Sequence, residues 1–570
     1  MLRKRLFAIL IAVTFLFLFV IGRLFYVQIV WGKDLQEKAI DQWTREIPII
    51  APRGIITDRN GTILADNQDT YSVFVRKSGV KNIEEVATAL SSILDMDYSY
   101  VLSRLTKTIS SEVTIKKQVS KSQIQSLQKY NFSGVYYSRD NTRVYPYNEM
   151  LASVLGFTSN DSKGQAGIEL YYNKYLEGKN GEILYETDIV GKELEDKKAS
   201  YIPAIDGLNI KLTIDFDIQM LVESAMAKAM QMHKCKSASM LVLDPNSGEI
   251  LALANLPSLN LNDLPRDDLD SLNKLSRNTL ISDVYEPGST FKILTAAANI
   301  EESLKGNKNA YNVNHVYSSS RYRYIDGQRV RCWSDHKNGK HQGLTLEGAL
   351  NNSCNPIFVD IAMSLGKETM YKYIDLFNYG KATGVDFLGE SSGMVLPITA
   401  VQNVDLARIA FGQTIAVTGL QLASATASAI NGGYYFMPRL IKQIYSKEGI
   451  VLSEFSKTLK NRVISEEASS ILNSLLEKVV SEGSGKNAYI DGYRVAGKTG
   501  TAQKYENGVI ASGKYISSFV GYFPANSPKY LALVVINEPE GQYYGSTVAS
   551  PYAKEVFEGI IDLKNIPRCD

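Results

Sequence analysis

This sequence is poor in cysteine and has almost no excess of charge of either sign. Four cysteines in 570 residues are too few for a scaffold that disulfide bonds hold together. The 62 basic and 60 acidic residues leave a net charge of +2, which gives no reason to expect a nucleic acid as partner. With 45% hydrophobic and 21% charged residues, the composition is that of a globular chain with room for two or three domains.

The longest apolar run stands at the amino terminus. Three basic residues at positions 3–5 precede it, it is unbroken from Leu6 to Ile21, and apolar character resumes as far as Trp31. The run is long enough to cross a bilayer with tilt, and no small-residue cleavage site follows it. We therefore expect an uncleaved single-pass signal anchor over residues 6–31, with residues 1–5 in the cytoplasm and the rest of the chain outside the membrane.

Residues 286–292 read Glu-Pro-Gly-Ser-Thr-Phe-Lys. Good helix formers follow Ser289, so we expect a helix to begin there and to place Ser289 and Lys292 on one face. A lysine desolvated by apolar neighbours can lose its proton near neutral pH and then accept one from a serine hydroxyl. The simpler interpretation is a buried serine beside a lysine on an ordinary helix, and it is preferred while this short S-x-x-K pattern stands alone.

Two later motifs change that judgement. Ser353, Cys354 and Asn355 form an S-x-N triplet, and residues 498–500 form a K-T-G triplet that Thr501 follows. The three motifs, in this order, resemble the set found in β-lactamases and penicillin-binding proteins. Residues 53–65 carry the pattern R-G-x-x-x-D-R-N-G-x-x-L-A, which is similar to the segment that opens the extracellular part of class B penicillin-binding proteins. A β-lactamase would be soluble and much shorter, so the class B family is the closer resemblance.

The resemblance implies an α+β protein with a membrane anchor, a β-rich amino-terminal pedestal of the dimerisation type, and a penicillin-binding transpeptidase domain. We place the pedestal at residues 32–205 and the transpeptidase domain, a five-stranded antiparallel sheet with a helical lobe, at residues 206–565. The β-rich segments that we expect to form this sheet are 240–243, 250–254, 493–496, 517–523 and 530–536. In the pedestal, the Asn-Gly turn at 60–61 predicts a hairpin, and helical spacing over about 80 to 130 predicts a small inserted lobe.

The resemblance also implies a catalytic role for five residues. Ser289 attacks a carbonyl carbon and Lys292 accepts its proton. Ser353 passes a proton to the leaving amine, while Asn355 orients the lysine and the substrate amide. Lys498, on an edge strand, supplies positive charge where a substrate carboxylate must lie.

The K-T-G segment is the expected substrate-binding edge, made by Thr499, Gly500 and Thr501. The two threonine hydroxyls face the substrate carboxylate, and the backbone N–H groups of Ser289 and Thr501 form the oxyanion hole, as they do in the family. An edge strand also lets an extended peptide add by β-pairing.

The activity implied is that of a D,D-transpeptidase, which cross-links peptidoglycan stem peptides through a serine acyl-enzyme and can release D-Ala as a carboxypeptidase in a side reaction. β-Lactams would acylate the same serine, and the chemistry requires no cofactor. Class B enzymes usually work with a polytopic membrane glycosyltransferase, which we expect as the partner. The alternative is a membrane-bound β-lactam sensor or cell-wall scaffold that retains the acylation site, although a sensor should have more cytoplasmic sequence.

Residues 492–499 also match the phosphate-loop pattern G-x-x-x-x-G-K-[ST]. Such a loop needs a helix that begins at its Lys-Thr, because the helix amino terminus helps to hold the phosphates. The residues from Gly500 to Gly508 are a poor start for a helix, and nucleoside triphosphates are scarce outside the cytoplasmic membrane. The K-T-G interpretation is therefore preferred.

Two of the four cysteines and two of the four histidines fall between Cys332 and Cys354. Ser353 and Asn355 should face the substrate, which turns Cys354 toward the loop that holds the others. A structural zinc could then brace the wall of the active site. A disulfide, two buried thiols and chance clustering are the alternatives. The candidate ligands are Cys332, His341 and Cys354 with either Asp335 or His336.

Overall fold

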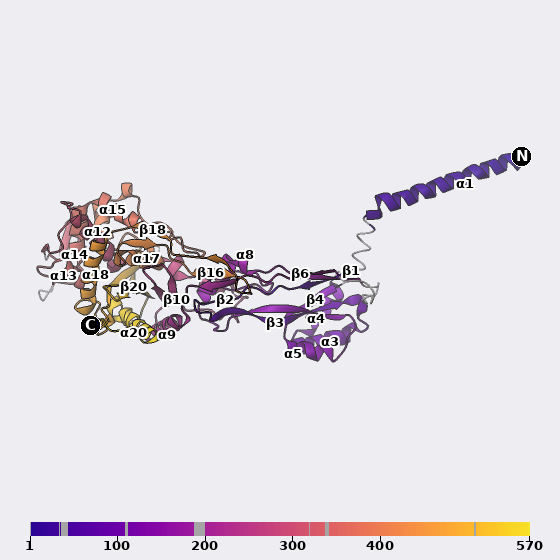
Figure 1. Cartoon of the computed structure of the whole chain (residues 1–570), viewed down its shortest axis with the longest axis horizontal. Coiled ribbons are helices and arrows are strands. Elements are labelled where there is room, and N and C mark those ends of the chain that lie inside the picture. The colour runs from indigo at the N-terminus through magenta and orange to yellow at the C-terminus, as the bar shows by residue number, and fades with distance from the viewer. Residues whose placement is uncertain are drawn as a thin grey trace. The chain divides into compact units, whose positions relative to one another are not determined.

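The structure is a computed structural model of the chain, and it describes residues 2–33, 35, 44–108, 112–186, 200–318, 320–336, 341–506 and 509–569. The chain folds into two compact units, whose elements are labelled in Figure 1. The first unit holds Met1–Arg53, Asn67–Thr142 and Glu177–Gly207, and the second holds Gly54–Asp66, Arg143–Leu176 and Leu208–Asp570.

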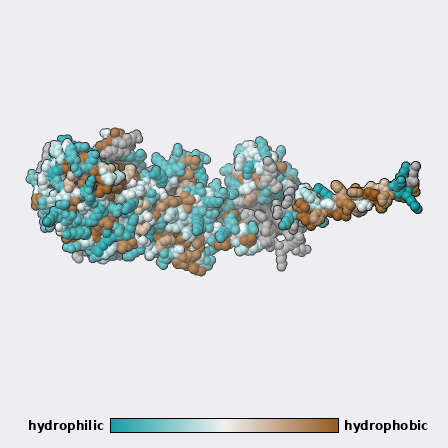
Figure 2. All heavy atoms as spheres, turned by 90° about the horizontal axis from the view of Figure 1, so that it is seen from above, coloured by the Kyte–Doolittle hydropathy of each residue, from teal (hydrophilic) through white to brown (hydrophobic). Residues whose placement is uncertain are grey.

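The amino-terminal segment is the apolar helix α1 (Leu2–Phe25), which continues as the π-helical turn η1 (Tyr26–Val30). In the described part of the chain it is the one helix long and apolar enough to cross a membrane. Figure 2 shows hydrophobic side chains along the helix and hydrophilic ones at its free tip. Near the other end, the Arg23 guanidinium lies over the rings of Tyr26 and Trp31, residue types that favour a membrane–water interface. The helix fits a single-pass membrane anchor.

The first unit has a small hydrophobic core of its own. Residues of β3 (Ile63–Arg76) and β4 (Glu112–Val119) pair in antiparallel fashion, β5 (Val135–Val144) pairs with β3, and three helices bury their apolar faces in the same cluster. Ser120 caps the third helix with a reciprocal capping box, as its sequence S-x-x-Q favours. The helices are α3 (Ile83–Leu94), α4 (Tyr98–Lys107) and α5 (Lys121–Gln128). Separately, β6 (Gly181–Glu186) pairs with β1 (Thr44–Ile49) and β7 (Ser200–Ile202).

The pattern at residues 53–65 forms the predicted hairpin, because β2 (Ile56–Thr57) pairs antiparallel with the start of β3. Asp58 closes the turn by accepting the backbone N–H groups of Asn60 and Thr62. Its other carboxylate oxygen accepts the N–H of Phe216 at the start of α9 (Phe216–His233). Gly54–Asp66 belong to the second unit, so the hairpin turn fixes the start of a helix within that unit, and the motif has a structural role.

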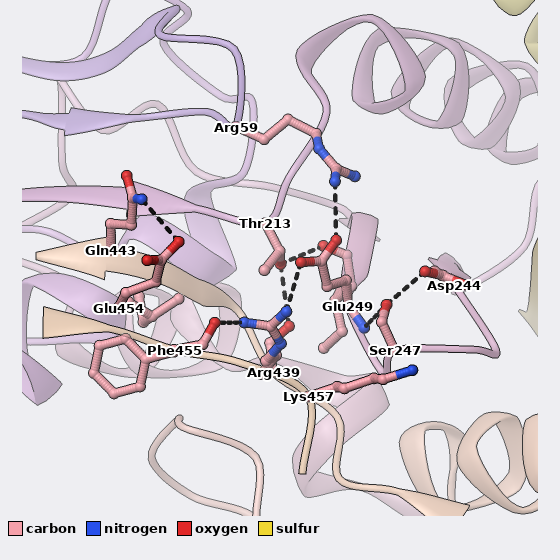
Figure 3. A network of polar contacts seen from close by, with 12 residues as sticks. Arg59, Thr213, Asp244, Ser247, Glu249, Arg439, Gln443, Glu454, Phe455 and Lys457 are labelled. Atoms are coloured by element: carbon pink, nitrogen blue, oxygen red, sulfur yellow. Dashed lines mark hydrogen bonds and ion pairs between the residues drawn. The ribbon is translucent and has the colours of Figure 1, made fainter. Parts of the chain in front are cut away.

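A cluster of three charged side chains strengthens this attachment (Figure 3). The Arg59 guanidinium lies 2.9 Å from one oxygen of Glu249, and the Arg439 guanidinium lies 2.6 Å from the other. Glu249 is mostly buried, so removing either arginine would leave a desolvated carboxylate with half of its partners. The hairpin turn, the turn that carries Glu249 and the segment that carries Arg439 are held together in this way.

The second unit is built on a five-stranded antiparallel sheet, as predicted. The order is β10 (Ile250–Leu256), β9 (Ser237–Leu243), β21 (Tyr530–Asn537), β20 (Val509–Phe523) and β19 (Ala496–Glu506). The expected strand at 493–496 is wrong in its bounds. Arg494 has a φ of +44°, which interrupts extended backbone, so the strand begins at Ala496 and runs through the K-T-G residues. The phosphate-loop pattern therefore has no helix at its Lys-Thr.

Side chains alternate between the two faces of this sheet, and each face has its own core. Met240 and Val242 of β9 pack with α9 and α20 (Ser550–Lys564), whereas Leu241 and Leu243 belong to the larger core. The helices of the larger core, the helical lobe, are α12 (Lys292–Leu304), α13 (Leu346–Asn351), α14 (Asn355–Leu365), α15 (Lys367–Leu376), α16 (Asn403–Ile409), α17 (Gly419–Ile430) and α18 (Glu466–Ser481).

Short strands complete the second unit. One group joins β2 through the order β17-β16-β8-β2, and the others are two-stranded ribbons. Their bounds are β8 (Asn209–Leu212), β11 (Val284–Tyr285), β12 (Tyr322–Ile325), β13 (Gln328–Arg331), β14 (Val417–Thr418), β15 (Tyr434–Phe436), β16 (Ile441–Tyr445), β17 (Val451–Glu454) and β18 (Leu459–Arg462).

Candidate active site

Ser289 lies in a single 3₁₀ turn, η3 (Gly288–Phe291), directly before α12. The helix thus begins where the sequence predicts, although its first turn is tighter than an α-helix. Gly288 and Gly412 both have positive φ, and their backbones touch because the Gly288 N–H donates to the Gly412 carbonyl at 3.0 Å. A Cβ atom on Gly412 would lie 2.1 Å from the Gly288 oxygen, so this contact requires glycine. The serine itself is half-buried at the wall of a cavity of about 320 Å³.

Lys292 is fully buried, and its amine meets three oxygen atoms of the S-x-N turn. The Nζ atom donates to the Ser353 carbonyl at 2.8 Å, to the Ser353 Oγ at 3.1 Å and to the Asn355 Oδ1 at 2.7 Å. Burial lowers the pKa of the Lys292 amine to about 8, and nearby Cys332 and Cys354 act in the opposite direction. The amine can therefore change its protonation state near neutral pH.

The S-x-N turn joins α13 to α14. Ser353 adopts a φ of +51°, which is uncommon for a residue with a side chain. Its N–H donates to the Leu350 carbonyl and that of Cys354 to the Ala349 carbonyl, so the turn is tied to the end of α13. Ser353 and Asn355 contact Lys292, whereas Cys354 is buried in the cluster described below.

The K-T-G residues lie on β19, which is the edge strand of the sheet, as predicted. Lys498 is fully buried, and its Nζ atom lies 3.3 Å from the Thr499 carbonyl oxygen and 3.5 Å from the Thr499 hydroxyl. Burial, and then the charge of Lys292, lower the pKa of the Lys498 amine well below its ordinary value. The Thr501 hydroxyl accepts the Gly545 N–H at 3.0 Å.

Gly500 explains why the motif has glycine in its third position. A Cβ atom there would lie 2.4 Å from the Ser518 hydroxyl and 3.0 Å from the Pro287 carbonyl oxygen. Only glycine therefore lets β19 approach the turn that carries Ser289.

The three motifs meet at one cavity. Ser289, Ser353, Asn355, Thr499 and Thr501 line it, with the Lys292 and Lys498 side chains buried nearby. A larger cavity of about 620 Å³ shares Gln503 with it but contains none of the predicted site residues. Sequence reasoning missed several other lining residues, which carry no motif because they come from loops and from strands whose pairing only the fold reveals. They include Arg331, Trp333, Ser484, Tyr515, Tyr543, Tyr544 and Ser546.

The predicted metal ligands also meet. One potential ligand atom from each of Cys332, His336, His341 and Cys354 lies within 4.8 Å of the others, and Asp335 is not in this group. His341 is buried, and its Nδ1 atom has no hydrogen-bond partner among the described residues. A hydrogen bond from Cys354 lowers the pKa of the Cys332 thiol, which favours a thiolate. Two sulfur and two imidazole donors make the set that zinc prefers.

The chain belongs to the penicillin-binding proteins. Residues 238–558 match the penicillin binding protein transpeptidase domain, and residues 48–212 match the penicillin-binding protein dimerisation domain. This confirms the class B resemblance and the predicted α+β fold.

Individual proteins of the family resemble the chain over most of its length. It is 37% identical to stage V sporulation protein D of Bacillus subtilis, over 96% of this chain and 84% of that one. It is 29% identical to the peptidoglycan D,D-transpeptidase FtsI of Escherichia coli, over 96% of this chain and 90% of that one. The crystal structure of a peptidoglycan synthetase from Bifidobacterium adolescentis matches with a TM-score of 0.73 at 27% identity, covering 92% of this chain and 98% of that one.

Acylation of Ser289 should depend on pH through Lys292. Only the neutral amine can accept the serine proton, so the rate should rise about tenfold per pH unit below about pH 8 and level off above it. The measurement is the second-order rate constant for a penicillin reacting with the full chain in detergent, from about pH 6 to about pH 10. A rate that stays flat, or that falls as the pH rises through this range, would contradict the role of Lys292 as base.

Proposed function

We propose that this chain is a serine D,D-transpeptidase that cross-links peptidoglycan stem peptides. The observation that carries the proposal is the meeting of three distant motifs at one cavity, where the Lys292 amine bonds both Ser353 and Asn355. The family membership supports the same function, since its FtsI member carries the name peptidoglycan D,D-transpeptidase.

In the first half-reaction, the Ser289 hydroxyl attacks the carbonyl of the penultimate D-Ala as the neutral Lys292 amine takes its proton. The backbone N–H groups of Ser289 and Thr501 stabilise the oxyanion of the tetrahedral intermediate. Ser353, bonded to the Lys292 amine at 3.1 Å, passes a proton to the departing D-Ala nitrogen. An ester between Ser289 and the stem peptide remains.

In the second half-reaction, an amine of another stem peptide attacks the ester carbonyl, and Ser289 recovers its proton. Water in place of the amine gives D-Ala-D-Ala carboxypeptidase activity from the same intermediate. The substrate carboxylate lies against Thr499, Thr501 and Lys498, where its negative charge favours the protonated form of the buried Lys498. No step needs a cofactor, and a β-lactam would stop at a stable ester of Ser289.

The membrane arrangement follows from the anchor. Arg3, Lys4 and Arg5 remain in the cytoplasm, so both folded units lie outside the membrane. A polytopic membrane glycosyltransferase is the proposed partner, reached through α1 and the first unit. Deleting residues 1–31 should abolish its co-purification with the chain, and retention of the partner by the shortened chain would contradict this interface.

Covalent labelling tests the acylating residue. A fluorescent penicillin should add to the full chain in a ratio of about one to one and add nothing to Ser289→Ala, because only that hydroxyl forms the ester. Intact mass spectrometry measures both. A full adduct on Ser289→Ala would overturn the assignment, and an adduct on the natural chain without release of D-Ala from a stem peptide would indicate a sensor or scaffold.

We further propose that Cys332, His336, His341 and Cys354 bind one structural zinc ion. Two thiols and two imidazoles close to one another are a donor set that suits zinc. The buried His341 Nδ1 atom also supports the site, because it has no hydrogen-bond partner among the described residues, whereas buried polar atoms normally have one. The ion would link the loop after β13 to the S-x-N turn. It would take no part in the acyl transfer.

Metal analysis of the purified chain tests this site. We expect about one zinc per chain, its loss in Cys332→Ser, and a Tm lower by about 5 °C or more, because a structural ion stabilises the fold that binds it. Asp335→Asn is the matched control and should keep the ion. A Cys332–Cys354 disulfide in the peptide map, with no zinc, would refute the proposal.

A further inference from the structure

A short β-ribbon beside the cavity carries an unusual concentration of arginine and tyrosine. β12 and β13 pair antiparallel, with Tyr322 opposite Arg331 and Tyr324 opposite Arg329. Residues that stand opposite one another project from the same side of a ribbon. These four side chains therefore share one side, which we call the hairpin face.

The other side of the ribbon is attached to the helical lobe. Arg323 makes two bonds of 2.6 Å to the Asp360 carboxylate on α14, and Val330 is buried. The two-residue turn at Asp326 and Gly327 has both φ angles positive, which is the geometry that an Asp-Gly turn favours. The ribbon is thus held in one position with the hairpin face outward.

The charges of the hairpin face are not neutralised. Arg329 and Arg331 are exposed, and neither guanidinium has an acidic partner among the described residues. Arg329 lies 5.1 Å from the Tyr322 ring centroid, and Tyr324 is 69% exposed. Over residues 321–331 the sequence has four arginines and one aspartate. A surface of this kind attracts carboxylates, which guanidinium groups bind in bidentate fashion.

The hairpin face leads into the catalytic cavity. Arg331 lines the cavity, and its carbonyl accepts the Asn355 Nδ2–H at 3.4 Å. Trp333 follows two residues later on the same wall, and its ring N–H donates to the Asn352 carbonyl at 3.1 Å. This wall belongs to the helical lobe, whereas β19, the edge strand proposed for the donor peptide, belongs to the sheet. The two walls can therefore serve two peptides.

We propose that the hairpin face binds the acceptor stem peptide and directs its amine to the acyl-enzyme on Ser289. The proposal rests on the proposed function, under which both substrates are stem peptides that end in free carboxylates. The arginines bind the carboxylates of the acceptor peptide, and the tyrosine rings pack on the apolar parts of that peptide. The acceptor thus approaches along the helical lobe while the donor remains on β19.

The partition of the acyl-enzyme tests this proposal. A depsipeptide donor ending in D-Ala-D-lactate acylates Ser289, and the ester then divides between water and an acceptor tetrapeptide that has a free side-chain amine. In the natural full-length chain, the ratio of transfer to hydrolysis should be at least about fivefold higher for the acceptor with a free carboxyl end than for its carboxamide. Arg329→Glu should abolish that preference, and Tyr324→Ala should lower transfer of both acceptors.

A ratio measured on one acyl-enzyme is unaffected by loss of active protein, so a poorly folded variant does not mimic the result. Arg462→Glu, at an exposed arginine on β18 outside the hairpin and the cavity, is the matched control and should keep the natural preference. Penicillin labelling in parallel separates the two proposals. Labelling without any carboxylate preference, or with a preference that survives in Arg329→Glu, overturns the acceptor site, whereas absence of labelling overturns the transpeptidase function on which it rests.

Discussion

The burial of one lysine amine is the constraint on which the rest of this site depends. Lys292 lies in a fully buried position where, among the residues that the structure describes, the S-x-N turn alone supplies hydrogen-bond acceptors to its Nζ atom. The difference between its ordinary pKa of 10.5 and about 8 corresponds to roughly 3 kcal/mol in favour of the neutral amine. A lysine exposed to water would stay charged at neutral pH, and one buried without acceptors would lose its orientation.

Several structural features serve to keep this amine in place. The contact between Gly288 and Gly412 sets the turn before α12, and Gly500 lets β19 approach that turn. The cluster of Cys332, His336, His341 and Cys354 adjoins the cavity wall that Arg331 and Trp333 form. Cys332 directly follows the last residue of β13, and Cys354 is the middle residue of the S-x-N turn. An ion bound by both would therefore join the β12–β13 ribbon to the turn whose oxygen atoms bind the Lys292 amine.

Much of this arrangement could be predicted from the sequence, because short motifs report local chemistry. The helix start at Ser289, the Asn-Gly hairpin and the opposite directions of Ser353 and Cys354 follow from local rules, whereas the edge position of Lys498 was implied by the resemblance to the family. Two strands were harder to predict from the sequence. β4 lies within a stretch of helical spacing, and the strand expected at 493–496 is prevented by the positive φ of Arg494. Spacing alone also could not choose between Asp335 and His336, because loop geometry decides which one reaches the cysteines.

The residues that line the cavity without a motif were beyond sequence reasoning for a different reason. Tyr515 stacks on Tyr543, and the Tyr544 ring is tilted against that of Tyr543, across a strand and a loop that only the folded sheet brings together. The β12–β13 ribbon did have a signal, since Asp326-Gly327 between alternating residues is typical of a hairpin. That the ribbon lies beside the cavity, however, can be seen only in the folded structure.

The most direct measurement of the central claim is the rate of penicillin acylation in Lys292→Arg. Arginine keeps the positive charge and can donate to the same oxygens, but it cannot lose its proton at these pH values. If the buried amine is the base, acylation of a folded Lys292→Arg chain should be slower by about a hundredfold or more at every pH. Acylation within about tenfold of the natural rate would show that Lys292 supplies only charge, and the account of the site would be wrong.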